Sequence, residues 1–302
     1  MFTPHDPVHG LIRLPGVVQD LVDTQVFQRL RHIKQLGVAS FVYPGATHDR
    51  FLHSIGTAFL AHELMGNLRL QQPELGISDR DCLCVTVAAL CHDLGHPCFS
   101  HTFESFLRAL AATLPTGERR EKLARWRHED ASVALTARLL EDLRPALTNA
   151  GLCCDATGDD WRLILELIDP PAGLSDVTVE TWPAVACGRG VEKAWMYEIV
   201  SNWRSGLDVD KCDYFRRDAY CLGIRREFDH HRFLLSLRVV SNDLGLPLLA
   251  APGKDCDFLR DNALETRLVL HKAAYQHKAV KKLELHLVDV LLLMEKDRLP
   301  IC

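Results

Sequence analysis

The chain has 302 residues, of which 47% are hydrophobic, a formal net charge of −5 and an isoelectric point near 6.3. It can therefore bury a large core, but it has no overall positive field for coating nucleic acid, so any polyanionic ligand must be held by a local cluster of cations. The eleven cysteines include no CxxC pair and follow no signal peptide, which favours a reducing compartment. No apolar run approaches the roughly 18 residues that span a bilayer, so we expect a soluble intracellular protein.

Helical patterns dominate the chain from its start. Residues 23–37 place Phe27, Leu30 and Ile33 on one stripe that ends at Gly37, and residues 54–70 form a second helical pattern. In a third pattern, residues 78–95, Ser78 caps the start and Gly95 ends the helix. Further helices are expected at 129–147, 159–168, 191–204, 210–221, 229–240 and 260–295.

Strand signals are sparse. Residues 244–254, "LGLPLLAAPGK", are consistent with a short hairpin, and three segments rich in Gly, Pro or charge predict exposed loops at 113–127, 148–158 and 169–190. The sequence shows no internal repeat. We therefore predict a mainly α fold in a single domain over residues 1–302, with at most a small β-hairpin.

The stretch "CHDLGHPCFSH", residues 91–101, concentrates metal-ligand side chains where a predicted helix ends. His92 and Asp93 differ by about 100° around a helix, so both can reach one point only where the helix opens. Alone, the pair also fits a capped helix end with a surface histidine. Further ligands are available from His53 and from Asp210 at the start of another helix. Two imidazoles and two carboxylates suit Mn, Fe, Zn, Ni or Mg and leave positions for water and substrate.

Several longer motifs share this order, among them "DPVHGLIRL", "YPGATHDRFLHSIG", "LCHDLGHPCFSH", "GLDVDKCDYFRRD" and "HKAAYQHK". From about residue 5 to about 285 the chain resembles the catalytic domain of the SAM-and-HD-domain deoxynucleoside triphosphate triphosphohydrolases. The resemblance implies an HD-domain helical fold. It also implies one divalent transition metal (Zn, Fe or Mn) on His53, His92, Asp93 and Asp210, with Mg accompanying bound nucleotides.

The resemblance further implies hydrolysis of dNTPs at the α-phosphorus to a deoxynucleoside and inorganic triphosphate. His128 matches the family's catalytic histidine, and Glu104 stands where the family has an Asp that partners it. A carboxylate on the far nitrogen of an imidazole fixes its tautomer and favours its protonated form, as a general acid requires. His96 and His101 match additional active-site histidines, which the residues alone also explain as capping after the helix end.

The substrate residues follow partly from helical spacing. Asp210, Tyr214 and Asp218 lie within about 80° of one helix face, and Arg267, His271 and Tyr275 share another stripe, although plain amphipathic helices explain both patterns as well. The resemblance implies that cations serve the triphosphate and that a tyrosine under the sugar selects deoxynucleotides. The residues implied to bind substrate are Gln35, Leu36, Arg50, Lys211, Tyr214, Asp218, Arg267, His271, Tyr275 and Gln276.

Members of the family form tetramers when guanine and deoxynucleotide activators bind between subunits. The guanine-reading positions fall on Asp23, Gln28 and Arg31, and parts of the second activator pocket fall on Val42, Tyr43, Arg232, His277 and Lys278. However, Phe2 replaces a Lys, His5 an Asn and Ala273 an Arg, and the loop "AAPGKDCDF" is out of register. Loss of a cation from a buried phosphate site can abolish binding, so these departures disfavour a nucleotide-driven tetramer and favour a dimer.

Relative to this family, the chain corresponds to a shortened form without the SAM domain and C-terminal lobe, whether a paralogue, a splice form or an incomplete gene model. An exposed apolar surface near residues 284–294 is then expected. The first functional hypothesis is a metal-dependent dNTPase that is nuclear, as the family implies, or cytoplasmic. The alternative is a non-catalytic nucleotide-binding regulator or hetero-oligomer subunit. An HD phosphohydrolase for monophosphates is a third, which Arg267 and Lys211 disfavour.

Overall fold

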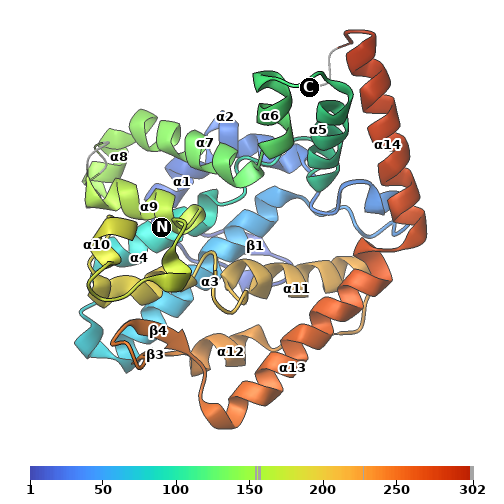
Figure 1. The fold of residues 1–302 in the computed structure, drawn as a ribbon. Helices are drawn as coiled ribbons and strands as arrows, with labels where there is room; N and C mark the ends of the chain where they lie inside the picture. Colours follow the sequence, from blue (N-terminus) through green and yellow to red (C-terminus); the bar gives the residue numbers. More distant parts are fainter. Residues whose placement is uncertain (154, 156–157, 227, 300–302) are drawn as a thin grey trace.

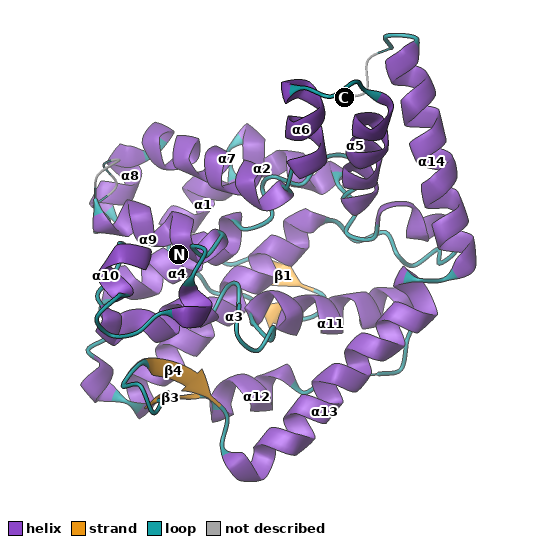
Figure 2. Ribbon diagram, in the orientation of Figure 1, coloured by secondary structure: helices purple, strands orange, loops and turns teal. Residues whose placement is uncertain are grey.

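The structure is a computed structural model that describes residues 1–153, 155, 158–226 and 228–299 (Figure 1). Helices make up most of this part of the chain, and its strands form two small antiparallel pairs (Figure 2). The predicted mainly α fold is therefore confirmed. No helix among the described residues is both long and apolar enough to cross a membrane.

The N-terminal segment begins with a short hairpin in which His5 pairs with Leu11 and Asp6 with Gly10. The helix predicted over 23–37 is wrong beyond its first turn. Gln35 N donates to His48 O at 3.1 Å and Arg50 N to Ile33 O at 2.9 Å, so backbone pairing with residues 48–50 replaces helical bonding. The elements here are β1 (His5–Asp6), β2 (Gly10–Leu11), α1 (Val17–Val22), α2 (Gln25–Gln28), and the 3₁₀ turns η1 (Arg29–His32) and η2 (Gly37–Phe41).

Four helices build the core that holds the site: α3 (Arg50–Gln71), α4 (Asp79–Cys91), α9 (Asp159–Ile168) and α11 (Val209–Leu222). α4 packs between α3 and α9, and every residue from Leu83 to Cys91 is buried (Figure 1). Ser78 caps α4 as predicted, through a reciprocal pair of bonds with Asp81. A helix buried on all sides fixes the position of its own end, and α4 ends at the His-Asp pair.

A second group of helices covers the core on one side: α5 (His101–Thr113), α6 (Glu118–Arg125), α7 (His128–Asp142) and α8 (Arg144–Asn149). The prediction of a loop over 113–127 is wrong because it contains α6, whose residues are all at least partly exposed. The helix predicted at 129–147 is broken between α7 and α8. Short turns follow: η3 (Pro73–Leu75), η4 (Leu174–Asp176), α10 (Trp182–Val185) and η5 (Val191–Glu198), a 3₁₀ helix where an α-helix was predicted. The loop predicted at 148–158 lies partly outside the described residues.

The C-terminal part contains α12 (His230–Ser236), the hairpin of β3 (Arg238–Ser241) and β4 (Pro247–Ala250), α13 (Gly253–Leu270), a π-helical turn η6 (His271–Tyr275) and α14 (Lys278–Lys296). The predicted hairpin exists, but its first strand precedes the predicted stretch and pairs Arg238 with Ala250. The single helix predicted at 260–295 is interrupted by η6. Gln276 ends η6, and α14 begins two residues later, at Lys278.

α14 stands beside α5, away from the main core (Figure 1). Val288 and Leu291 pack with Phe106 and Leu110 in a separate small cluster. On the other face, Leu285 and Leu293 are 64% and 59% exposed, which confirms the expected exposed apolar surface near residues 284–294.

The expectation of reduced cysteines holds for most of the described cysteines but fails at one. Cys98 is disulfide-bonded. The free described cysteines are Cys82, Cys84, Cys91, Cys153, Cys187, Cys212 and Cys221.

Candidate metal centre and active site

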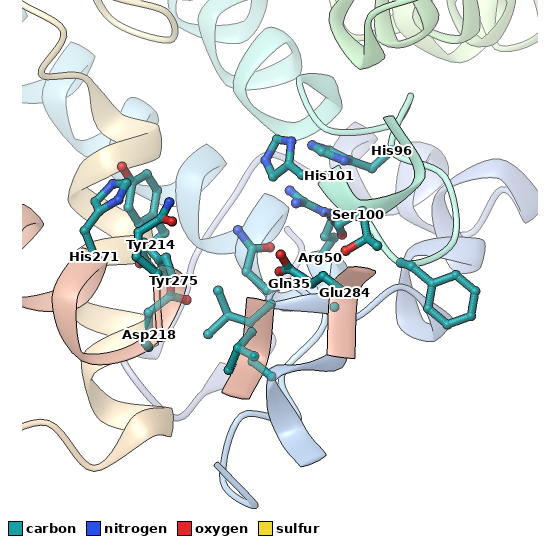
Figure 3. Close-up of a pocket in the computed structure, with 18 of the residues that line it drawn as sticks. Gln35, Arg50, His96, Ser100, His101, Tyr214, Asp218, His271, Tyr275 and Glu284 are labelled. Carbon is teal, nitrogen blue, oxygen red and sulfur yellow. Dashed lines mark hydrogen bonds between the residues drawn. The ribbon is translucent and has the colours of Figure 1, made fainter. Parts of the chain in front are cut away.

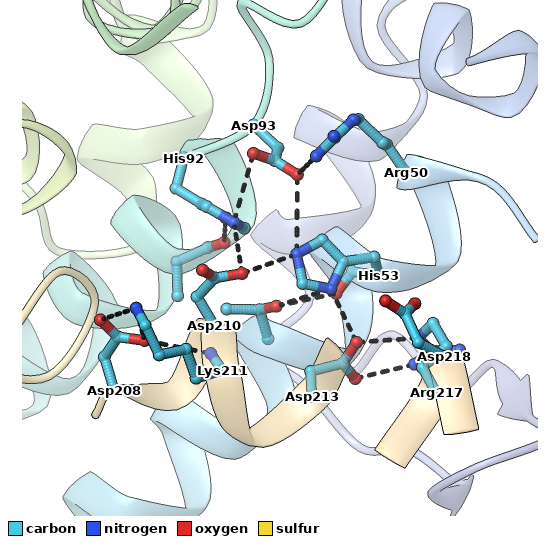
Figure 4. Close-up of polar contacts among 12 residues, drawn as sticks. Arg50, His53, His92, Asp93, Asp208, Asp210, Lys211, Asp213, Arg217 and Asp218 are labelled. Carbon is cyan, nitrogen blue, oxygen red and sulfur yellow. Dashed lines mark hydrogen bonds and ion pairs between the residues drawn. The ribbon is translucent and has the colours of Figure 1, made fainter. Parts of the chain in front are cut away.

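Two buried histidines point a ring nitrogen at the same place (Figure 4). His53 lies in the first turn of α3, and its Nδ1 donates to Asp213 Oδ2 at 2.7 Å. His92 caps the C-terminus of α4, and its Nδ1 donates to the carbonyl oxygen of Ala89 at 2.8 Å. Each ring is therefore oriented by its far nitrogen, which leaves Nε2 of both histidines facing the centre.

Two carboxylates complete this group. Asp210, in the first turn of α11, places Oδ1 at 2.9 Å from His53 Nε2 and 3.4 Å from His92 Nε2. Asp93 follows His92 after the helix end; its Oδ2 lies 3.5 Å from His53 Nε2, and its Oδ1 lies 3.5 Å from His92 Nε2. The structure thus brings together all four residues that the sequence predicts as metal ligands, from three separate segments.

The residues present fit a metal ion. Nε2 of His53 and of His92 are fully buried and have no hydrogen-bond partner, although carboxylate oxygens surround them. A buried polar nitrogen without a partner is costly unless an ion or water satisfies it. His53, His92 and Asp210 each offer a ligand atom within 4.8 Å of the others, and a nitrogen and oxygen donor set is typical of a divalent transition metal.

Electrostatics of the group favour a cation. Burial lowers the pKa of His53, but the neighbouring carboxylates of Asp210 and Asp213 outweigh this and raise the pKa to about 10. Burial opposes ionisation of Asp210, yet the two neighbouring histidines hold its pKa well below the usual range. A metal ion at this place would therefore compete with a proton for Nε2 of His53.

Beside the metal group lies a histidine and glutamate pair. His128 opens α7, and its Nδ1 donates to Glu104 Oε1, on α5, at 2.7 Å. Partial burial raises the pKa of Glu104, but bonds from His101 and His128 outweigh it and hold the pKa well below its usual range. Glu104 therefore remains a carboxylate, so the longer side chain still orients His128 and leaves Nε2 free.

Three histidines gather here: His96, His101 and His128 offer nitrogens within 4.8 Å of one another. The rings of His96 and His128 are stacked, 3.8 Å apart and only 28° from parallel. Lone pairs on stacked rings run side by side rather than converging, so this arrangement suits contacts to an anion or proton transfer better than shared ligation of one ion.

A cavity of about 470 Å³ opens from the metal group toward α14 (Figure 3). Its wall includes nine of the ten predicted substrate residues: Gln35, Leu36, Arg50, Lys211, Tyr214, Asp218, His271, Tyr275 and Gln276. His96, His101 and His128 line its end near the metal group. The predicted shared face of α11 is therefore present, because Asp210, Tyr214 and Asp218 all contribute to one wall.

The cations of the cavity are held by carboxylates. Arg50 donates through Nε to Ser100 Oγ at 2.9 Å and through Nη1 to Asp93. Lys211 Nζ lies 3.0 Å from Asp208, the N-cap of α11. Both side chains therefore have fixed positions before any anion arrives.

The far end of the cavity is a hydrogen-bonded group around Asp218. The Tyr275 hydroxyl donates to Asp218 Oδ2 at 2.5 Å, and His48 Nε2 lies 2.7 Å from Asp218 Oδ1. Burial raises the pKa of Tyr275 well above its usual range. Tyr275 is therefore a rigid, neutral wall, and Gln35 adds a buried Oε1 that has no partner within the described residues.

Arg267 is the exception among the predicted substrate residues. It does not line the first cavity but a second one, of about 480 Å³, between α11, α12, β4 and α13. Lys211 lines both cavities. Arg267 therefore lines the cavity next to the first one, and its contact with a triphosphate stays a prediction.

The predicted activator residues fall into separate places. Arg31 Nε donates to Gln28 Oε1 at 2.7 Å, and Gln28 Nε2 donates to Val22 O, next to exposed Asp23.

The residues predicted for the second activator pocket lie elsewhere. The rings of Tyr43 and His277 are 5.8 Å apart, and Val42 packs in the same small cluster as Tyr43. Lys278 begins α14 next to His277, whereas Arg232 is exposed on α12. Where the family's Arg would fall, Ala273 accepts a bond from the Tyr43 hydroxyl.

Several residues of the site were missed from the sequence. Ser100 holds Arg50 and also donates to Lys34 O at 2.9 Å, while Lys281 and Glu284 of α14 line the cavity. Asp213, behind His53, was passed over as well. The available signal was its position three residues after Asp210, because side chains three apart on a helix are neighbours.

Comparison with known proteins shows what this chain is similar to. Residues 50–165 match the HD domain. Over 290 residues, 95% of this chain, 42% are identical to human deoxynucleoside triphosphate triphosphohydrolase SAMHD1, of which 44% is covered. The zebrafish (Danio rerio) protein of the same name is 41% identical over 95% of this chain and 44% of its own length. The Dictyostelium discoideum homolog is 35% identical over 94% of this chain and 48% of its own.

The chain thus spans less than half of the length of these three relatives. The HD match contains His53, His92, Asp93, Glu104 and His128, whereas Asp210 lies beyond it. Residues 50–165 of the chain are thus similar to the HD domain, and almost all of the chain is similar in sequence to the deoxynucleoside triphosphate triphosphohydrolases.

Proposed function

We propose that this chain is a metal-dependent dNTP triphosphohydrolase that converts deoxynucleoside triphosphates to deoxynucleosides and inorganic triphosphate. The observation that carries the proposal is the meeting of His53, His92, Asp93 and Asp210 at one end of the 470 Å³ cavity that also holds the Glu104–His128 pair. The names of the relatives, deoxynucleoside triphosphate triphosphohydrolases, support the substrate class.

In this proposal the four residues hold one divalent metal, Zn, Fe or Mn, and Mg accompanies the nucleotide. When bound, the metal would supply Lewis-acid activation of a phosphoryl oxygen and of the attacking water. Arg50 and Lys211 line the cavity beside the metal group and would contact the phosphates. Because carboxylates already fix both cations, they would cost little reorganisation when the phosphates bind.

His128 is the proposed general acid. Its Nδ1 is bound to Glu104, so the free Nε2 would deliver a proton to the 5′-oxygen of the leaving deoxynucleoside. His96 and His101 stand against His128 and would contact the α-phosphate. A positioned acid of this kind contributes about 10²–10⁴-fold to a rate, so His128→Gln should reduce turnover within this range.

Tyr275 and Asp218 would select the sugar. Their mutual hydrogen bond fixes the aromatic ring as a wall of the cavity, and its bulk would exclude a 2′-hydroxyl sterically, which favours deoxyribose. Gln35 and Gln276 are the polar groups left at this end of the cavity for the sugar.

The alternative proposal is a non-catalytic nucleotide-binding regulator or hetero-oligomer subunit. The specific observation in its favour is the position of Arg267. This predicted phosphate contact lines the second cavity, so it does not add its charge to the wall of the first. Such a protein would bind metal and dNTP without turnover.

Purified protein should be incubated with dGTP or dATP and Mn²⁺, and the products separated by anion-exchange chromatography. The expected products are deoxynucleoside and intact triphosphate, and Asp210→Asn should abolish both. The matched control, Asp243→Asn, changes a carboxylate of the β3–β4 connection and should leave the products unchanged. Orthophosphate as the product would contradict the proposed reaction, and bound dNTP without products would favour the regulator.

A further inference from the structure

Behind the metal group, Asp6, His9, Asp213 and Arg217 form a closed hydrogen-bonded ring, and His53 is bound to this ring through Asp213. Asp213 Oδ2 accepts from His53 Nδ1 at 2.7 Å and from Arg217 Nε at 2.8 Å, while Oδ1 accepts from His9 Nε2 at 2.7 Å and from Arg217 Nη2 at 2.9 Å. Each oxygen thus accepts two bonds, which is the full capacity of a carboxylate. Asp213 has no freedom to rotate.

The ring closes through the N-terminal hairpin. Arg217 Nη1 donates to Asp6 Oδ2 at 3.0 Å, and Asp6 Oδ1 accepts from the backbone N of Val8 and of His9, both at 2.8 Å. Asp6 therefore shapes the turn that carries His9 and also anchors the guanidinium that holds Asp213. His9 and Asp213 are 204 residues apart in sequence.

All members of the ring are shielded from water. Asp6, Asp213 and Arg217 are at most 1% exposed, and the His9 side chain is 3% exposed. Figure 4 shows Asp213 and Arg217 on the side of His53 opposite to Asp210. Breaking one bond in such a place leaves a buried polar group without a partner, so the ring behaves as a unit.

A glycine on α3 makes room for the ring. A Cβ added at Gly56 would lie 2.0 Å from Asp213 Oδ1 and 2.4 Å from Arg217 Nη2. These atoms are not free ends that can move aside, because four donors fix the carboxylate. The absence of a side chain at Gly56 is therefore what lets Asp213 approach His53.

We propose that Asp6, His9, Asp213 and Arg217 are positioning residues that fix the orientation of His53 and thereby set the affinity of the metal site. This inference rests on the role of His53 as a metal ligand in the proposed function. It makes the N-terminal hairpin, outside the HD match, part of the metal site. A ligand histidine whose second nitrogen donates to a fixed carboxylate is more basic at Nε2 and is held in one orientation.

The test measures binding of Mn²⁺ by calorimetry to metal-free protein, at one pH and well below the unfolding temperature. Gly56→Ala removes no ligand and no charge, yet it must displace Asp213, and His9→Leu removes one donor from the ring. Each should weaken Mn²⁺ binding, within the roughly 10–100-fold range typical of lost outer-shell partners. His9→Gln retains a donor for Asp213 and should bind Mn²⁺ more tightly than His9→Leu.

Two matched controls separate positioning from general damage. Gly66→Ala lies on the same helix, where an added Cβ would meet nothing within 4 Å. His5→Leu lies on the same hairpin, and His5 is exposed. Both controls should bind Mn²⁺ as the unmodified chain does. The thermal midpoint of each metal-free variant is measured in parallel, to show that it is folded at the temperature of the titration.

Unchanged Mn²⁺ affinity in folded Gly56→Ala and His9→Leu proteins would overturn the inference, even if their midpoints fall, because the ring would then be only structural. Equal weakening in His9→Gln and His9→Leu would also contradict it. The proposed function fails separately: a chain that binds Mn²⁺ but hydrolyses no dNTP contradicts that function and leaves the positioning role intact. A chain that binds no Mn²⁺ would overturn both.

Discussion

His48 shows how one residue couples the substrate cavity to stability. It is buried and faces Asp218, the carboxylate that also binds Tyr275. Burial lowers the pKa of His48, but the bond to Asp218 outweighs it and raises the pKa to about 9. The protonated form is therefore favoured in the folded protein, whereas an unfolded histidine titrates near pH 6.5.

Stability from this pair should be complete below pH 6.5 and lost as the pH rises toward 9, because the folded state then gives up a proton that it binds more tightly than the unfolded state does. The shift corresponds to roughly 3 kcal/mol at most. Urea unfolding at several pH values should show a steeper fall in unfolding free energy for the unmodified chain than for His48→Gln. Parallel curves for the two proteins would contradict the assignment.

At the scale of elements, the contact between the end of α4 and the start of α7 places His128, the proposed acid, beside the metal group. Gly95 N donates to Ser132 Oγ at 2.8 Å, and an added Cβ at Gly95 would lie 2.1 Å from the backbone oxygen of His128. Gly95→Ala must push the first turn of α7 away without removing any ligand. Because a displacement of about 1 Å can cost 10²-fold, kcat should fall by about this factor while Mn²⁺ affinity stays unchanged. Gly66→Ala is the control, and an unchanged kcat would show that α7 does not position the acid.

Local sequence signals predicted the elements near the site well where capping residues decide them. Ser78 and the Gly95 region bounded α4, so the location of His92 and Asp93 at a helix end could be read directly from the sequence.

Contacts between distant segments could not be predicted in this way. The apolar stripe of Phe27, Leu30 and Ile33 gave no sign that residues 33–35 would pair with 48–50 instead of continuing a helix. Asp213 and His9 could not be paired because no periodicity links residues 204 positions apart. The resemblance implied that Arg267 binds substrate, but the helical stripe that it shares with His271 and Tyr275 could not show which of two cavities it lines.

At the scale of the whole molecule, the site depends on segments distant in sequence. The HD match supplies His53, His92, Asp93 and the Glu104–His128 pair, while Asp210 and most of the far cavity wall come from α11, η6 and α14. Assembly into larger species is a different matter. Phe2, His5 and Ala273 stand where the family resemblance has Lys, Asn and Arg, so the positive charge for a second nucleotide is reduced.

Sedimentation velocity should therefore show the same species with and without GTP and dGTP, because a missing cation at a phosphate site costs several kcal/mol. The double variant Phe2→Lys with Ala273→Arg restores the two cations and should respond more strongly to nucleotide. A shift of the unmodified chain to tetramers on addition of nucleotide would contradict this expectation.

The most direct test of the account is the position of a bound metal. Crystals grown with Mn²⁺ should show one anomalous difference peak among His53 Nε2, His92 Nε2, Asp93 and Asp210, at about 2.0–2.2 Å from its nitrogen and oxygen ligands. A peak among His96, His101 and His128 instead, or no peak near His53 at full Mn²⁺ saturation, would contradict it.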